Sequence, residues 1–184
     1  MIDYEDRLEL AWEADDGADE REAARREAAN LAVLTGVTAV EEGSSVRLRE
    51  EQPELYHELE RINARLDLLM DLVGRLLSER RAQGRTRRVK VAVEQVTFAA
   101  EADEAQPGQA GRLQLFLHSS VPEPLILVGR IVADSRDDEG RRWARFQPYP
   151  MGGRLLDALG QLVFRHHRRM VAEQRSRRDH DTQS

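Results

Sequence analysis

The feature that most constrains the fold is an apolar repeat in the middle of the chain. From Leu55 onward, apolar residues recur at alternating spacings of four and three. This 3.5-residue period keeps one face of a helix turned toward a partner helix over several turns. We therefore predict one long helix over residues 52–83, with this seam as its oligomerisation surface. The seam consists of Leu55, Leu59, Ile62, Leu66, Leu69, Val73 and Leu76.

The flanks of the seam indicate how many helices meet. Pro53 is tolerated in a first helical turn and Gly84 ends the pattern, which gives a helix of roughly 45 Å at 1.5 Å per residue. Toward the end of the repeat the flanking positions become apolar, at Met70, Leu72 and Leu77. A wider apolar face suits three or four helices, so we expect a tetramer or another helical bundle. The alternative is a core helix of a monomer, for which the remaining chain is short.

Composition narrows the class of protein. The chain has 184 residues, of which 34% are charged and 40% hydrophobic, with no cysteine and a formal net charge of −6. These values fit one domain with an elongated appendage, and they argue against a large compact enzyme. The first residues lack the pattern of a signal peptide, and no run approaches the roughly 18 apolar residues of a membrane span. We expect a cytoplasmic protein that does not bind membranes.

Charge divides the chain into three segments. Residues 1–51 hold 15 acidic and 6 basic side chains, whereas residues 80–88 hold five arginines and no acid. We predict an acidic N-terminal helical segment over 1–51, the heptad helix over 52–83, and a third domain over 84–184. The first segment should contain a helix from Asp19 to about Thr35, interrupted near Gly36. Its apolar face would be Ala24, Ala28, Leu31 and Leu34.

The third segment is typical of short strands followed by a helix. Alternating apolar residues predict strands over 89–93, 96–100 and 113–117, and a hairpin formed by 125–133 and 141–147. Several short strands at this spacing indicate a small antiparallel barrel. A closing helix should follow Gly153, with a basic tail after it. The fold class is therefore α+β, with long N-terminal helices before the barrel.

Catalytic and metal-binding patterns are weak. His166 and His167 are adjacent, so on a helix their side chains point about 100° apart and cannot chelate one ion. We interpret this pair as solvated, and the acidic run Asp137–Glu139 as a solvated hairpin tip. We predict no enzyme, no cofactor and no metal. Nucleic-acid binding through the basic tail is an open alternative, but the acidic total and the absence of an aromatic platform disfavour it.

Arg81 and Arg85 form an RxxxR pattern directly before the first predicted strand of the barrel. Guanidinium groups at this spacing can grip phosphates in a bidentate manner. Together with the strand at 125–132 and the closing helix, this pattern resembles a PilZ domain over roughly residues 81–175. Because the heptad helix precedes it, the chain looks most like divergent PilZ proteins whose long helices drive tetramer formation.

The resemblance implies a site for cyclic di-GMP, built from RxxxR and a second motif, D/NxSxxG. The second motif would align with Lys90–Gln95, where its polar residues and its glycine are replaced. Arg81 and Arg85 are thus candidates for a degenerate nucleotide site, and we expect binding to be lost. The resemblance implies a non-enzymatic regulatory scaffold with protein partners in cyclic-di-GMP-linked motility, pili or virulence. The alternative is a receptor that retains weak binding through Arg81 and Arg85.

Overall fold

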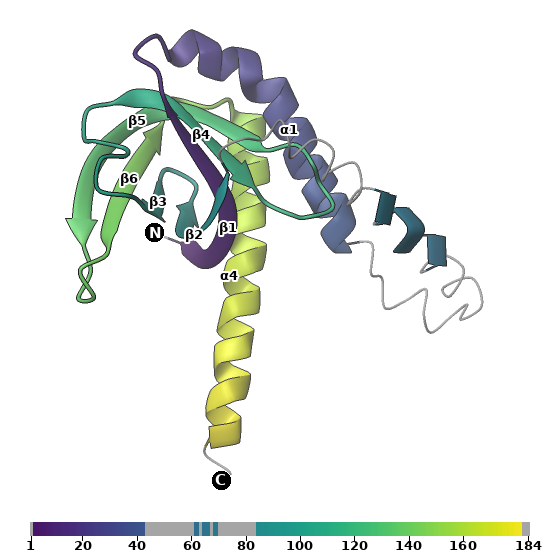
Figure 1. The fold of residues 1–184 in the computed structure, drawn as a ribbon. Helices are drawn as coiled ribbons and strands as arrows, with labels where there is room; N and C mark the ends of the chain where they lie inside the picture. The colour runs from purple at the N-terminus through teal and green to yellow at the C-terminus, as the bar shows by residue number, and fades with distance from the viewer. Residues whose placement is uncertain (1, 43–60, 63, 67, 70–83, 182–184) are drawn as a thin grey trace.

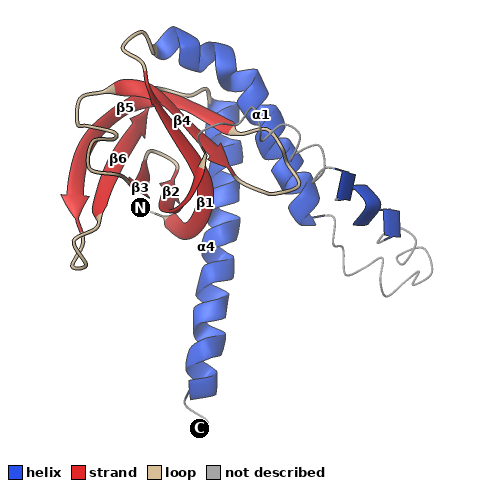
Figure 2. Ribbon diagram, viewed as in Figure 1, coloured by secondary structure: helices blue, strands red, loops and turns tan. Residues whose placement is uncertain are grey.

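A computed structural model describes residues 2–42, 61–62, 64–66, 68–69 and 84–181. Within these residues, six strands form one sheet and two longer helices pack against it (Figures 1 and 2). The short described stretches between 61 and 69 are also helical. The elements are β1 (Asp3–Ala14), α1 (Glu20–Glu42), β2 (Arg85–Ala92), β3 (Val96–Ala99), β4 (Ala110–Phe116), β5 (Leu125–Arg136), β6 (Arg142–Pro148) and α4 (Gly153–Asp181).

The sheet closes into a barrel with the strand order β1-β2-β3-β6-β5-β4. Every neighbouring pair is antiparallel, so short turns can connect β2 to β3 and β5 to β6. In the first turn the Ala92 N–H donates to the Gln95 carbonyl at 2.9 Å. In the second, Gly140 has a φ of +76°, a conformation that glycine adopts without strain. The strands expected from Val89 onward are all present.

Strand β1 was not expected from the sequence. Residues 1–51 were predicted to form a helical segment apart from the barrel, yet β1 closes it by pairing with β2 along Asp3–Leu10 and with β4 along Glu9–Ala14. Tyr4, Leu8 and Leu10 share one face of the strand and are buried, whereas the charged Asp6, at the same register, is exposed and interrupts the alternation expected of a half-buried strand. The high acidic content of this segment obscured that alternation. The barrel is therefore not confined to residues 84–184.

The barrel interior is filled by apolar side chains from all six strands. Because successive residues of a strand point to opposite faces, alternate positions reach the interior and pack there. Two phenylalanines from strands that pair with each other lie at its centre. The largest fully buried side chains of the strands are Leu10, Phe98, Leu113, Leu115, Leu125, Ile131 and Phe146.

Helix α4 packs its first turns against the barrel. Leu155, Leu159, Leu162 and Val163 are each about 1% exposed, and their spacing places them on one helix face. The helix begins at Gly153, within one residue of its predicted start. Its C-terminal part projects beyond the barrel (Figure 1).

Helix α1 lies along β5 and α4 and differs from its prediction in two ways. It continues through Gly36, where an added side-chain carbon would meet only Val121 at ordinary contact distance. Its buried apolar residues are Val33, Leu34 and Val37, whereas Ala24 and Ala28 of the predicted face are exposed. The buried face of α1 was predicted wrongly because it includes polar residues. Their hydrogen-bond partners lie far away in the sequence.

Two of these polar residues fix α1 to the barrel. The Asn30 side chain accepts from the Ile126 N–H at 2.9 Å and donates to the Ile126 carbonyl at 2.8 Å. It thereby satisfies the edge of β5 where β6 does not pair with it. Glu22, which is 8% exposed, accepts two hydrogen bonds from Arg112 of β4, at 2.6 and 3.0 Å. Both contacts give α1 a defined orientation on the sheet.

Candidate functional site

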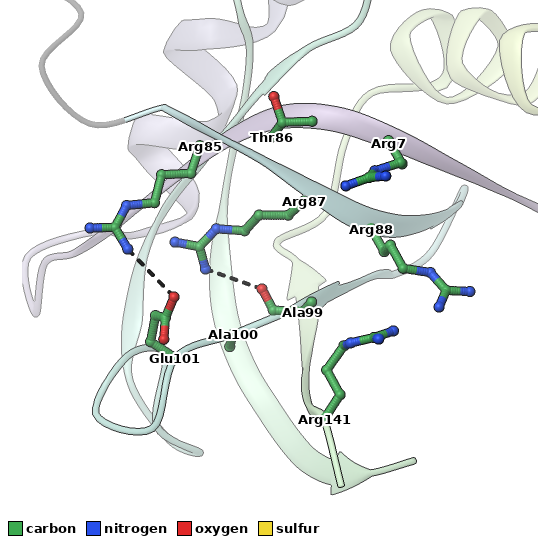
Figure 3. Close-up of a pocket in the computed structure, with 9 residues that line it drawn as sticks. All are labelled: Arg7, Arg85, Thr86, Arg87, Arg88, Ala99, Ala100, Glu101 and Arg141. Atoms are coloured by element: carbon green, nitrogen blue, oxygen red, sulfur yellow. Dashed lines mark hydrogen bonds and ion pairs between the residues drawn. The ribbon is translucent and has the colours of Figure 1, made fainter. Parts of the chain in front are cut away.

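A pocket of about 390 Å³ lies beside the first residues of β2. Figure 3 shows that arginines from three parts of the fold surround it: β1, β2 and the turn before β6. Arg85, one of the two residues predicted from RxxxR, is among them, whereas Arg81 lies outside the described residues. The lining residues are Arg7, Arg85, Thr86, Arg87, Arg88, Ala99, Ala100, Glu101 and Arg141.

Arg85 and Arg87 point toward the loop after β3, and both meet carboxylates there. Arg85 Nη1 lies 3.4 Å from Glu101 Oε1, and both side chains are largely exposed. Arg87 donates to both carboxylate oxygens of Glu104 and, at 3.1 Å, to the Ala99 carbonyl. The Arg87–Glu104 pair is mostly buried and is part of the fold, whereas the Arg85–Glu101 pair lies in solvent.

The other arginines of the pocket differ in their partners. Arg88 donates from Nε to Glu5 at 2.9 Å, and this bond raises the pKa of its guanidinium. Arg141 donates from Nη2 to Glu139 at 2.7 Å. The side chain of Arg7 has no hydrogen bond or ion pair with any other residue that the structure describes. Four of the five guanidinium groups that line the pocket thus have a carboxylate partner, and that of Arg7 has none among the described residues.

A buried arginine holds the loop that borders the pocket. Arg142 is 7% exposed and donates to the carbonyls of Glu101, at 2.8 Å, Glu104 and Ala105, at 3.0 Å. Its Nε donates to Asp134 at 3.1 Å. These bonds hold Ala105 at a φ of +51°, a region that residues other than glycine rarely adopt. Arg142 therefore shapes the wall of the pocket without lining it.

Sequence reasoning missed Arg142, although a signal was present. Arg142 occupies the same inward-facing register of β6 as Ala144 and Phe146, both of which are fully buried. An arginine at an inward position of an apolar strand is rarely buried unless it is paired. It indicates a polar network inside the fold.

The structure separates the two predicted halves of the nucleotide site. Arg85 begins β2, whereas Lys90–Gln95 forms the end of that strand and the turn to β3. Five strand residues span roughly 17 Å, so Arg85 and Lys90 lie at different ends of the strand. None of the residues 90–95 lines the described pocket.

The heptad seam is described only in part. Ile62, Leu66 and Leu69 are helical and lie 50%, 52% and 56% exposed in the single chain. Leu68, beside them, is 60% exposed. The other predicted seam residues, Leu55, Leu59, Val73 and Leu76, lie outside the described residues.

The histidine pair of α4 is partly buried and makes specific contacts, whereas a solvated pair was predicted. His166 Nε2 lies 2.7 Å from Glu41, and its ring stacks on Tyr4 at 4.5 Å. Burial, and next to it the charge of nearby carboxylates, raises the pKa of Tyr4. His167 Nδ1 lies 2.7 Å from the Asp3 carbonyl. The pair thus joins α4 to α1 and β1, contacts that the local sequence does not reveal.

Among the described residues, no group of three or more histidine, cysteine, aspartate or glutamate residues is placed to hold a metal ion. In the same part of the chain, no helix is both long and apolar enough to cross a membrane.

Comparison with known proteins places the chain in a family. The family model of the atypical PilZ domain, described as a cyclic di-GMP receptor, matches residues 34–177. No curated protein sequence matches the chain.

Solved structures give a second comparison. The chain is 27% identical to a pathogenic protein from Xanthomonas campestris, over 93% of this chain and 91% of that one, with a TM-score of 0.70. The crystal structure of that protein reveals a new tetrameric PilZ domain, self-assembled via an unusual helical bundle. A weaker match, at 13% identity and a TM-score of 0.38 over 45% of this chain and 41% of that one, is the Bacillus subtilis inhibitor of motility MotI.

The barrel with its closing helix has the expected PilZ-like fold, and the predicted resemblance is confirmed. PilZ domains are regulatory receptors rather than enzymes. The family model covers well over half of the chain, so the protein belongs to the atypical PilZ domain family of cyclic di-GMP receptors.

Proposed function

We propose that this protein is a self-assembling, non-enzymatic regulatory scaffold. It assembles through the heptad helix over residues 52–83, forms a tetramer, and acts in the cytoplasm through protein partners in cyclic-di-GMP-linked signalling. The observation that carries the proposal is the exposed apolar seam at Ile62, Leu66 and Leu69. Half-exposed large apolar side chains at heptad spacing gain stability when a second helix covers them.

The comparison supports a tetramer over other assemblies. The Xanthomonas campestris protein is a tetrameric PilZ domain that self-assembles via a helical bundle, and its identity and coverage relate nearly the whole of both chains. The apolar flanks Met70, Leu72 and Leu77 suit a bundle of more than two helices.

Two features of the pocket support loss of cyclic di-GMP binding. Its lining contains no aromatic residue on which a guanine base could stack. Arg87, which lines the pocket beside Arg85, is held in a mostly buried ion pair with Glu104 and is not free to grip a phosphate. In addition, Lys90–Gln95 lies at the far end of β2 and carries an exposed acid, Glu94, near the position of the lost second motif.

Titration calorimetry with cyclic di-GMP tests this part of the proposal. We expect no saturable heat at tens of micromolar protein. The control is the variant Glu101→Gln, which frees Arg85 from its acidic neighbour. If that variant also gives no heat, the missing second motif rather than the ion pair accounts for the loss.

A second candidate function is a receptor that still binds cyclic di-GMP. It is favoured by the description of the family and by the five arginines that line one pocket. Micromolar binding to the unmodified chain, abolished by Arg85→Ala or Arg81→Ala, would establish the receptor and overturn the proposed loss.

A further inference from the structure

The outer face of β1 and β2 carries an unfavourable pair of charges. Arg7 and Arg88 are direct cross-strand partners in the register of these strands, so both side chains stand on the same face, and both are exposed. Like charges directly opposite each other destabilise a sheet. Glu5 pairs with Arg88, but no described residue pairs with the side chain of Arg7. Like charges placed side by side at a cost in stability are typical of a functional surface.

Arg141 adds a third guanidinium to this face. Figure 3 shows its side chain extending toward that of Arg88. Its Nη1 is buried, makes no hydrogen bond, and lies 3.6 Å from the nearest carboxylate, that of Asp137. The carboxylate to which the Arg141 guanidinium donates, at its Nη2, is that of Glu139, whose side chain is 72% exposed, so a carboxylate from a partner can compete for this guanidinium.

The wall of the pocket is set before any ligand arrives. Arg142 fixes the loop after β3 through three backbone carbonyls, and the Arg87–Glu104 pair joins that loop to β2. By contrast, Arg85 and Glu101 form an ion pair in solvent, and such pairs contribute little. A carboxylate from another molecule can therefore replace Glu101 without disturbing the fold.

From these contacts we propose that the pocket docks an acidic segment of a partner protein, with Arg7, Arg88 and Arg141 as its main contacts and Arg85 at its edge. Guanidinium groups bind carboxylates and phosphates alike in bidentate fashion. The lining favours side-chain carboxylates over a nucleotide because none of its residues offers an aromatic platform for a base. This inference rests on the proposed function, since it specifies the chemistry of the protein partner.

The test is a fluorescence anisotropy titration of the full chain with a labelled octaglutamate peptide, with a neutral Gly-Ser peptide of equal length beside it. We expect salt-dependent binding of octaglutamate alone. Arg7→Glu should weaken it by about tenfold or more, because it reverses a charge at the contact. The same variant should raise the melting temperature, because it converts the Arg7–Arg88 repulsion into an attraction. Substitution of a residue with only a structural role would not weaken peptide binding and raise the melting temperature together.

Arg169→Glu is the matched control, since it makes the same charge change at an exposed position of α4. It should leave the affinity within about twofold. Equal weakening by both variants, or no binding of octaglutamate to the unmodified chain, would overturn the docking site. Displacement of the peptide by micromolar cyclic di-GMP, or tighter binding of single-stranded DNA through Arg7, would also overturn it. Sedimentation of the same samples measures the assembled mass and so separates failure of the docking site from failure of the proposed assembly. Arg7→Glu should leave that mass unchanged whether or not the peptide binds.

Discussion

Among single residues, Asn30 makes the most specific contact between α1 and the barrel. It is 4% exposed and forms two hydrogen bonds with the backbone of Ile126. In Asn30→Ala both backbone groups would lose their partner, and an unsatisfied buried group costs about 1–3 kcal/mol. We therefore expect the free energy of unfolding to fall by about 2–4 kcal/mol, measured by urea denaturation.

Thr35→Ala is a suitable control for that measurement. Thr35 lies exposed on the same helix, and its hydroxyl donates only to the Leu31 carbonyl of α1 itself. The change should stay within about 0.5 kcal/mol of the unmodified protein. If Asn30→Ala were equally mild, the contact with β5 would not determine how α1 is placed.

The lowered pKa of Glu22 implies that the free energy of unfolding depends on pH. Two hydrogen bonds from Arg112, and a further one from Arg26, hold the pKa of Glu22 below its ordinary value in the folded chain. In the unfolded chain the pKa of Glu22 is about 4.3. The stability that this shift contributes is thus fully present above that pH and is lost as the pH falls through the folded pKa.

Removing the charge tests that sign. Glu22→Gln should lower the free energy of unfolding at pH 7 by about 2 kcal/mol, because charged hydrogen bonds to Arg112 are lost. The difference between variant and unmodified protein should shrink as the pH is lowered below about 4.3. Glu20→Gln, an exposed neighbour, controls for net charge. A difference that stays constant down to pH 2 would contradict the role of the Glu22 carboxylate.

At the level of elements, the strands from β2 onward could be predicted because each shows local alternation bounded by turn residues. Strand β1 could not be, since its partners β2 and β4 lie more than 70 residues away and its acidic residues outweigh the apolar ones. The buried face of α1 was missed for the same reason. Its polar members are satisfied only by contacts across the fold, at Arg112 and Ile126.

Of the residues at the candidate site, only Arg85 could be predicted from the sequence. Arg85 lines the pocket as part of a local pattern, but Arg7 and Arg141 come from distant segments, and Arg142 acts through backbone carbonyls. These arginines lie close together only because strand pairing in the closed barrel brings distant segments side by side. No local sequence pattern encodes that pairing.

The heptad helix gives a prediction at the level of one element. Leu66→Asp together with Leu69→Asp would place two charges on the seam, and each buried unpaired charge costs about 3–5 kcal/mol. We expect the variant to elute as a smaller species in size-exclusion chromatography with light scattering, while the circular dichroism of the barrel persists.

The control places the same charges away from the seam. With Leu66 at heptad position a and Leu69 at d, His57 and Ala64 fall at the outward position f. His57→Asp with Ala64→Asp should therefore keep the assembled mass. Equal dissociation of both variants would mean that added charge, rather than the seam, controls assembly.

For the whole molecule, the fold separates two tasks. The barrel completes its own core within one chain, whereas Ile62, Leu66 and Leu69 lie about half-exposed in the single chain. The Tyr4–His166–Glu41 contacts join β1 and α4 to the end of α1, the last described residues before the heptad segment. A bundle of such chains would present one arginine-lined pocket per protomer, so that partners with several acidic segments could bind more than one protomer at once.

Sedimentation equilibrium of the full chain at tens of micromolar tests self-assembly most directly. The scaffold proposal predicts a mass four times that of the 21.0 kDa chain, independent of loading concentration across that range. A single species at the mass of one chain would contradict it, because the apolar seam would then have no partner helix from another chain.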